Sequence, residues 1–243
     1  MLLEHRKLNP QDMFLFKPAG GGRGDGIFFL PRDEQPPGNG VAQLYLAPVL
    51  HRGFKFDLRM YVMVTSVDPL KVYIYSEGLT RFATEPYSTP SDDNQGSARM
   101  HLTNTAVNAF SRDIFNIDGP SPQKRSVGDM LDILAVHGEY FIGAVARMSP
   151  EERRTRLWRE IETTLQRTFL GLSGAILQNA RFEFGANTFL HLQPPRCFGL
   201  YGADVLLDRT GRAVLLELNV RPSLGSKTPL DASIKGELLR DTM

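Results

Sequence analysis

Residues 201–224, YGADVLLDRTGRAVLLELNVRPSL, constrain the fold most, because their pattern predicts a β-hairpin with a polar site on one face. The first arm, residues 202–207, and the second arm, residues 213–220, are almost entirely apolar. A cluster of turn-forming residues, 208–211, separates them. The pattern therefore predicts two antiparallel strands joined by a short turn.

Three polar side chains interrupt the apolar arms: Asp204, Glu217 and Asn219. Because side chains alternate along a strand, Glu217 and Asn219 point the same way. Folding the arms about the turn brings Asp204 to within about two positions of Glu217, which predicts a diagonal cross-strand contact. Two carboxylates and an amide oxygen are hard ligands that suit Mg²⁺. The alternative interpretation is three polar residues on a solvated strand face.

A second feature lies near the N-terminus, where a short strand predicted at residues 14–17 ends at Lys17 and is followed by the glycine-rich PAGGGRGDG. Glycine lets backbone N–H groups approach an anion closely, and Lys17 and Arg23 add positive charge directed at phosphate. The loop does not match GxxxxGK[ST], and the strand-like IFFL after it excludes a dinucleotide-binding fingerprint. HRD and DFG are also absent, which excludes a protein kinase. Alone, the loop fits a flexible turn better, but together with the hairpin it indicates ATP and Mg²⁺.

The segment KFDLR, residues 55–59, lies between these two features, within a long strand predicted at residues 54–66. Alternation places Lys55, Asp57 and Arg59 on one face of that strand. Charges on so apolar a strand need partners or ligands, so they indicate either a binding site or an internal ion-pair network. Arg81 follows the next predicted turn and can reach the same site, where its planar fork suits a carboxylate.

Bulk composition excludes several classes of function. The 243 residues, 42% of them apolar, are enough for one large or two modest cores. The net charge of +1 gives no global polyanion-binding signature, so we expect no nucleic-acid partner. Cys197 is the single cysteine, which rules out an internal disulfide and fits a reducing compartment. No apolar run approaches ~18 residues, so we expect no membrane span.

Strand patterns occur in both halves of the chain with helical patterns between them, which predicts an α+β fold. We expect a strand at residues 71–75 to end in a turn at Glu77 and Gly78. Residues 84–99 are rich in Ser, Pro, Asp and Gly and predict a loop, with a lobe break near residues 84–100. Residues 181–196 are predicted to be irregular.

A helix is predicted at residues 151–172, after a shorter one at residues 127–137. Its apolar residues recur at i, i+3 and i+4 and form a stripe that faces a core. Around its first turns it carries four arginines, Arg153, Arg154, Arg156 and Arg159. They indicate either a solvated face or a docking patch for an acidic partner.

Several long motifs occur in order and together resemble the tubulin-tyrosine-ligase-like family. They are KFDLRMYVMVTSVDPLKVYIYSEGLTRFATEPYS, HLTN at residues 101–104, YGADVLLD, LLELNVRPSL and PLDASIK. The similarity extends over residues 14–241 and is greatest to the polyglutamylase members of the family. It implies one catalytic domain over residues 1–243 with an ATP-grasp fold, in which ATP and Mg²⁺ lie between two α+β lobes.

The resemblance also implies which residues bind the nucleotide. Lys17 is similar to the lysine that contacts the phosphates, and the glycine loop is similar to the family's phosphate flap. A short segment after the flap is similar to the hinge that holds adenine. The implied nucleotide-binding residues are Lys17, Gly22, Arg23, Gly24, Gly26, Gln43, Leu44, Tyr45, Leu46, Lys55 and Asp57.

The same resemblance implies substrate, catalytic and metal residues. Arg59 and Arg81 resemble the arginines that bind the amino-acid substrate and the developing intermediate, and with Lys55 they form the implied catalytic set. His101 and Asn104 of HLTN are assigned to the substrate side. The implied magnesium ligands are Asp204, Glu217 and Asn219, in agreement with the prediction from the hairpin.

The chain also departs from the family pattern. Glycines at positions 20–22 replace the usual serines, Ala203 replaces a usual phenylalanine, and Arg221 stands where a small residue is common. Family members carry an N-terminal domain ahead of Lys17, and only sixteen residues precede it here. We therefore expect the chain to lack that domain, and to lack the basic C-terminal extension that helps polyglutamylases hold microtubules.

The implied activity is that of an ATP-dependent ligase that adds glutamate to glutamate residues of tubulin tails through an acyl-phosphate intermediate. The implied partners are the acidic tails of tubulin or microtubules and free glutamate. We expect a monomer of the cytoplasm and cytoskeleton, including the cilium or basal body, with no nucleic-acid or membrane partner. Two alternatives stay open: a glycine or tyrosine ligase of the same family, or a catalytically inactive tubulin-binding module.

Overall fold

The computed structural model describes residues 2–20, 24–90, 98–103, 124–184 and 198–242. The chain forms two compact units, and both carry antiparallel sheets, so the fold is mixed α/β. The first unit contains residues 1–56 and 81–123, and the second contains residues 57–80 and 124–243. Two long strands, β5 (Phe54–Val67) and β6 (Leu70–Phe82), contribute residues to both units.

The first unit is built on a three-stranded sheet with the order β2 (Phe28–Leu30), β1 (Phe14–Pro18), β3 (Gly40–Leu44). Helix α1 (Leu2–Leu8) packs through Leu2 against a core on one face of this sheet. The other face holds a second core of Leu15, Phe29 and Leu102. The unit also contains the short strand β4 (Leu50–His51), which pairs with the start of β5, and the short helix α2 (Ala98–His101).

The second unit contains the larger antiparallel sheet, in which the strand order is β7-β6-β5-β8-β9. The remaining strands of this sheet are β7 (Arg125–Ser126), β8 (Gly199–Leu207) and β9 (Ala213–Asn219). Residues 58–64 of β5 pair with residues 199–205 of β8. Strands β8 and β9 confirm the predicted hairpin, and Asp208 closes its turn by accepting hydrogen bonds from the backbone N–H groups of Thr210 and Arg212.

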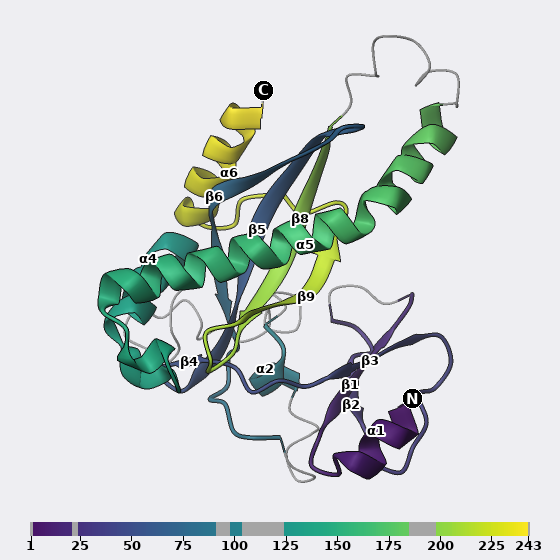
Figure 1. Ribbon diagram of the computed structural model, residues 1–243, viewed down its shortest axis with the longest axis vertical. Helices are drawn as coiled ribbons and strands as arrows, with labels where there is room; N and C mark the ends of the chain where they lie inside the picture. Colours follow the sequence, from purple (N-terminus) through teal and green to yellow (C-terminus); the bar gives the residue numbers. More distant parts are fainter. Residues whose placement is uncertain (1, 21–23, 91–97, 104–123, 185–197, 243) are drawn as a thin grey trace. The chain divides into compact units, whose positions relative to one another are not determined.

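Helices cover both faces of the larger sheet. The long helix α5 (Pro150–Phe184) crosses one face, beside the shorter helix α4 (Val127–Val136) (Figure 1). Its buried stripe ends at Phe169, whose ring meets Tyr201 of β8 at 5.3 Å. Helix α6 (Pro229–Thr242) packs on the opposite face, where its apolar residues surround Tyr61. Two 3₁₀ turns, Gly138–Tyr140 and Val145–Arg147, connect α4 to α5.

Two expectations about secondary structure are wrong. Strand β6 runs unbroken through Glu77 and Gly78, where we predicted a turn. Gly78 serves close packing instead, because an added Cβ would collide with the carbonyl oxygen of Arg59. Helix α5 continues to Phe184, whereas we predicted irregular structure from residue 181, because no proline or glycine interrupts residues 175–184.

The four arginines of α5 do not form a uniform solvated face. Arg153 is buried and donates hydrogen bonds to the carbonyl oxygens of Ala135, Val145, Ala146 and Met148. It thereby satisfies backbone acceptors where the connection from α4 meets α5. Its neighbour Arg154 pairs with Asp132, and Arg156 pairs with Glu160 one helical turn later, at 2.7 Å. These contacts favour a structural role for the first turns of α5.

None of the helices that the structure describes combines the length and the apolar character needed to cross a membrane.

Candidate functional site

The second unit carries a row of three charged residues across its sheet. Arg59 on β5 lies opposite Asp204 on β8, and Asp204 lies opposite Glu217 on β9. Cross-strand partners of this kind project from the same face of a sheet. We predicted a diagonal contact between Asp204 and Glu217, and this is wrong. A register shift between Asp204 and Val205 makes the two carboxylate residues direct partners.

Arg59 and Asp204 form an ion pair in this row. The guanidinium holds both carboxylate oxygens, through Nε to Oδ1 and through Nη2 to Oδ2 at 3.0 Å. Both side chains are largely shielded from solvent, with 15% and 4% of their surface exposed. Of the two interpretations of KFDLR, the ion-pair network therefore describes Arg59 in this structure. A bidentate pair also fixes the orientation of the Asp204 carboxylate.

A second row lies next to the first, with Gly202 of β8 opposite Asn219 of β9. Asn219 Nδ2 donates to the Gly202 carbonyl at 3.3 Å, so the amide is held by its nitrogen. A side chain at position 202 does not fit, because a Cβ would lie 2.9 Å from Pro222 and 3.2 Å from the Arg59 side chain. Gly202 therefore leaves the space that Arg59 needs to reach Asp204.

These residues suit a magnesium ion by donor type. Asp204, Glu217 and Asn219 share one face of the hairpin and offer two carboxylates and an amide oxygen, and Mg²⁺ is commonly held by one or two carboxylates together with substrate phosphates. Within the described ranges no group of three His, Cys, Asp or Glu side chains lies close enough to hold a metal. The hairpin trio differs from such a group because its third member is an amide.

A buried ionic cluster at the start of α6 was missed by sequence reasoning. Asp231 binds Lys124 Nζ, and Lys235 Nζ lies 4.0 Å from the same oxygen. Burial acts to raise the pKa of Asp231, but the hydrogen bond and charge of Lys124 lower it overall, whereas burial lowers the pKa of Lys235. The first two partners are 107 residues apart in the chain, so no local motif signals the pair. The helix is capped by Thr228, whose Oγ1 accepts from the Asp231 N–H at 3.1 Å.

The first unit places three of the predicted nucleotide residues, Lys17, Gln43 and Tyr45, on one face of its small sheet. Lys17 is two residues beyond Leu15 on β1, and Leu15 lies opposite Gln43 on β3. Alternation therefore places Lys17 and Gln43 on the face that also holds Tyr45 and the Leu15 core. Leu44 packs on the opposite face, against the core beneath α1. Leu46 is half-buried and follows directly after Tyr45.

Lys55, Tyr45 and His101 form a connected group in the first unit. Lys55 Nζ donates to the Tyr45 hydroxyl at 3.2 Å, and that hydroxyl lies 3.1 Å from His101 Nδ1. Lys55 and His101 are buried, with 5% and 1% of their surface exposed. Burial, together with the nearby positive charge of Lys55, lowers the pKa of His101 to about 4. Tyr87, which sequence reasoning also missed, packs its ring against His101 at 5.7 Å.

The described part of the glycine loop adopts the backbone that glycine favours. Gly24 and Gly26 have φ angles of 90° and 72°, which other residues rarely adopt. The predicted flap residues Gly22 and Arg23 lie outside the described residues, as does Asn104 of HLTN. Arg81 is half-buried near the end of β6 in the first unit.

Asp57, which we assigned to the nucleotide, is buried on β5 within the second unit.

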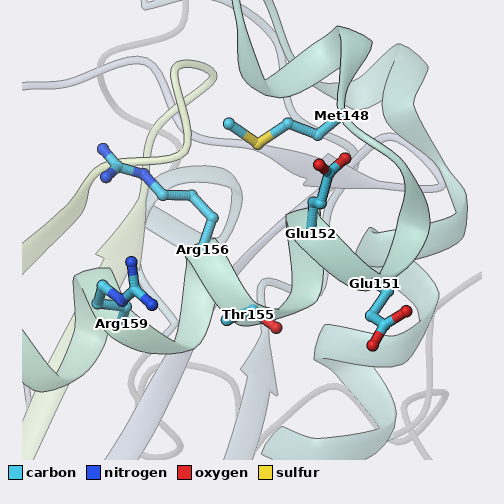
Figure 2. A pocket seen from close by; sticks show the side chains of 6 residues that line it. All are labelled: Met148, Glu151, Glu152, Thr155, Arg156 and Arg159. Atoms are coloured by element: carbon cyan, nitrogen blue, oxygen red, sulfur yellow. The ribbon is translucent and has the colours of Figure 1, made fainter.

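A cavity of about 500 Å³ lies at the start of α5, and none of the predicted site residues lines it. Figure 2 shows Glu152 pointing toward Met148, with Arg156 and Arg159 one and two turns further along the helix. Glu152 is committed to capping the helix, because its carboxylate accepts from the Ser149 N–H at 2.9 Å and from the Ser149 hydroxyl at 2.7 Å. Glu152 therefore serves the helix terminus.

Comparison with known proteins identifies the family. A family model described as the tubulin-tyrosine ligase family matches residues 1–243. Tubulin polyglutamylase TTLL6 of Mus musculus is 36% identical over 233 residues, which are 95% of this chain and 26% of that protein. Tubulin polyglutamylase TTLL13 of Homo sapiens is 36% identical over 233 residues, which are 95% of this chain and 27% of that protein. A probable beta-tubulin polyglutamylase of Tetrahymena thermophila is 34% identical over 242 residues, which are 96% of this chain and 19% of that protein.

The chain thus spans between 19% and 27% of the length of these three relatives. The family match covers every residue, and the family predicted from the sequence motifs is confirmed. The chain belongs to the tubulin-tyrosine ligase family.

Proposed function

We propose that this chain is the catalytic part of an ATP-dependent ligase with an ATP-grasp fold, which adds glutamate to glutamate side chains of tubulin tails. The observation that carries the proposal is the row of Arg59, Asp204 and Glu217 with Asn219 beside it, on one face of the β8–β9 hairpin. Family membership supports the same chemistry, and the matched relatives carry the name tubulin polyglutamylase.

Each unit carries its own group of proposed binding residues. In the first unit, Lys17, Gln43, Tyr45 and Lys55 offer a nucleotide surface with two cations for phosphate oxygens. In the second unit, the hairpin trio offers the oxygen ligands that Mg²⁺ prefers, and Arg59 fixes one of them. ATP supplies the phosphoryl group, and Mg²⁺ neutralises charge on it.

The proposed reaction has two steps. An oxygen of the acceptor carboxylate attacks the γ-phosphorus of ATP, ADP leaves, and an acyl phosphate forms. The amine of free glutamate then attacks the acyl carbon, phosphate leaves with the bonding electrons, and an amide bond and a released proton remain. Lys17 and Lys55 stabilise negative charge on the transferring group, while Arg59 and Arg81 orient carboxylates.

The proposal is tested by incubating the purified chain with ATP, Mg²⁺, labelled glutamate and microtubules. We expect label in tubulin with the natural chain and with Glu151→Gln, an exposed substitution on α5, but not with Glu217→Gln. Label with Glu217→Gln equal to the natural chain contradicts the proposal. Competition among free glutamate, glycine and tyrosine identifies the amino acid, and glutamate is expected to dominate.

A melting scan tests the nucleotide part separately. A ligand that binds only the folded state raises its stability by about 2.7 kcal/mol at a hundredfold excess over Kd. We expect ATP with Mg²⁺ to raise the melting temperature of the natural chain, and Lys17→Met to reduce the shift. No shift with the natural chain indicates a tubulin-binding module without catalysis.

A further inference from the structure

We propose that Tyr45 and His101 are positioning residues that hold the Lys55 ammonium in place for the phosphates of the nucleotide. This inference rests on the proposed function, because it assumes that Lys55 faces ATP. It assigns Tyr45 a role beyond that of a hinge beside adenine, and it moves His101 from the substrate side to the support of a nucleotide residue.

The hydroxyl of Tyr45 is an acceptor for Lys55. An ammonium group has three donors and no acceptor, so the contact of 3.2 Å requires the tyrosine oxygen to accept. The same ammonium lies 4.4 Å from the centre of the Tyr45 ring, within the range of a cation–π interaction. One tyrosine thus holds the lysine through its hydroxyl and through its ring face.

The Tyr45 hydroxyl is itself fixed by a second layer. His101 Nδ1 lies 3.1 Å from it. In one histidine tautomer Tyr45 donates to Nδ1, and in the other it accepts from Nδ1–H. In both cases the tyrosine oxygen keeps a lone pair for Lys55, so the support does not depend on the tautomer.

Aromatic rings pack against the imidazole of His101. Its ring meets Phe29 edge-on at 4.9 Å and Tyr87 at 5.7 Å. Burial and the charge of Lys55 lower the pKa of His101 to about 4, so the imidazole is neutral near pH 7. Burial also raises the pKa of Tyr45, so its hydroxyl keeps its proton. Two neutral side chains can lie beside a buried ammonium without repelling it.

The arrangement matters because lysine is flexible. Its four-carbon stem loses rotamer entropy when it is fixed. A lysine that is already held by Tyr45 has lost this freedom before ATP binds, so phosphate binding is tighter. The inference predicts that Tyr45 and His101 affect ligands with phosphates and leave adenosine binding unchanged.

The experiment measures the dissociation constants of ATP, ADP and adenosine by calorimetry, with Mg²⁺ present for the nucleotides. Tyr45→Phe removes the hydroxyl and keeps the ring, so ATP and ADP are expected to bind about three- to tenfold more weakly, and adenosine within about twofold. Lys55→Met is expected to weaken ATP binding at least as much as Tyr45→Phe does. Each variant is melted without ligand to show that it is folded.

Two histidine variants separate positioning from packing. The amide of His101→Asn occupies the place of Nδ1 and is expected to bind ATP within about twofold of the natural chain. The amide of His101→Gln reaches the place of Nε2 instead and is expected to match Tyr45→Phe. This rescue pattern is not expected if His101 only fills space.

Three results overturn the inference. If Tyr45→Phe binds ATP as the natural chain does while Lys55→Met does not, Lys55 contacts phosphate without this support, and the proposed function stands. If Tyr45→Phe weakens the binding of adenosine as much as the binding of ATP, the tyrosine contacts the adenine base and does not position Lys55. If the natural chain binds no ATP, the proposed function fails together with the inference.

Discussion

Two cations of the same strand are held in different ways, and the contrast separates the two units. Lys55 and Arg59 lie four residues apart on β5, Lys55 in the first unit and Arg59 in the second. Lys55 contacts the hydroxyl and ring of a neutral tyrosine, whereas Arg59 grips both oxygens of Asp204. A tyrosine orients a cation without cancelling its charge, but a carboxylate does both. The roles of Lys55 and Arg59 therefore depend on the partner that each side chain contacts, and the residue types in KFDLR do not determine them.

The largest expected effect is on activity and comes from the second unit. Glu217→Gln removes a proposed magnesium ligand, so glutamate incorporation is expected to fall by at least about a hundredfold. Because Glu217 is exposed, the free energy of unfolding is expected to change by no more than about 0.5 kcal/mol. Rates are measured with labelled glutamate and stability by urea titration. Activity that survives this substitution contradicts the proposal that the hairpin binds the metal.

The next effect is on stability and tests the difference between the two cations directly. Asp204→Asn leaves a shielded guanidinium without its carboxylate, so the free energy of unfolding is expected to fall by about 3 kcal/mol. Tyr45→Phe removes one hydrogen bond to Lys55 and is expected to cost about 1 kcal/mol. Urea titrations of both variants give the comparison. Equal losses mean that the two cations are held alike.

Arg153 extends the comparison to a third cation. It is buried, and the four hydrogen bonds described above all go to neutral carbonyl groups. Arg153→Met leaves four backbone acceptors without this donor and is expected to cost about 2–3 kcal/mol. Arg154→Met on the next, exposed position is the matched control and is expected to cost less than about 0.5 kcal/mol. Similar small losses in both variants contradict a stabilising role for the buried hydrogen bonds of Arg153.

A further effect on stability is a pH dependence from the first unit. The pKa of His101 is lowered to about 4 in the folded chain, below its ordinary value of 6.5, so the unfolded chain binds more protons between these values. The associated stability is fully present above about pH 6.5 and is lost as the pH falls toward about 4, with a loss on the order of 2 kcal/mol. Urea titrations at pH 7 and pH 4.5 measure it. His101→Asn is expected to show a smaller loss; an equal loss assigns the effect to other groups.

The sequence predicted those parts of the fold and site that depend on local periodicity. The apolar arms and the turn at residues 208–211 predicted β8 and β9, and alternation placed Asp204, Glu217 and Asn219 on one face. The stripe of α5 was likewise readable up to Phe169.

Contacts over long sequence separations were not readable in this way. The ion pair of Arg59 and Asp204 joins residues 145 positions apart, and the pairing of Tyr45 with His101 joins residues 56 apart. The bulge after Asp204 also has no local signal in the sequence. The predicted diagonal offset between Asp204 and Glu217 was therefore wrong. Gly78 read as a turn because sequence alone does not show which backbone approaches a glycine.

The central claim is that the hairpin residues Asp204, Glu217 and Asn219 hold the metal ion of an ATP-dependent ligase. The most direct test is a crystal structure of the chain with a non-hydrolysable ATP analogue and Mn²⁺, whose anomalous signal locates the metal. The account predicts Mn²⁺ bound by Glu217 together with Asp204 and Asn219. Mn²⁺ bound elsewhere, away from these three residues, would contradict it.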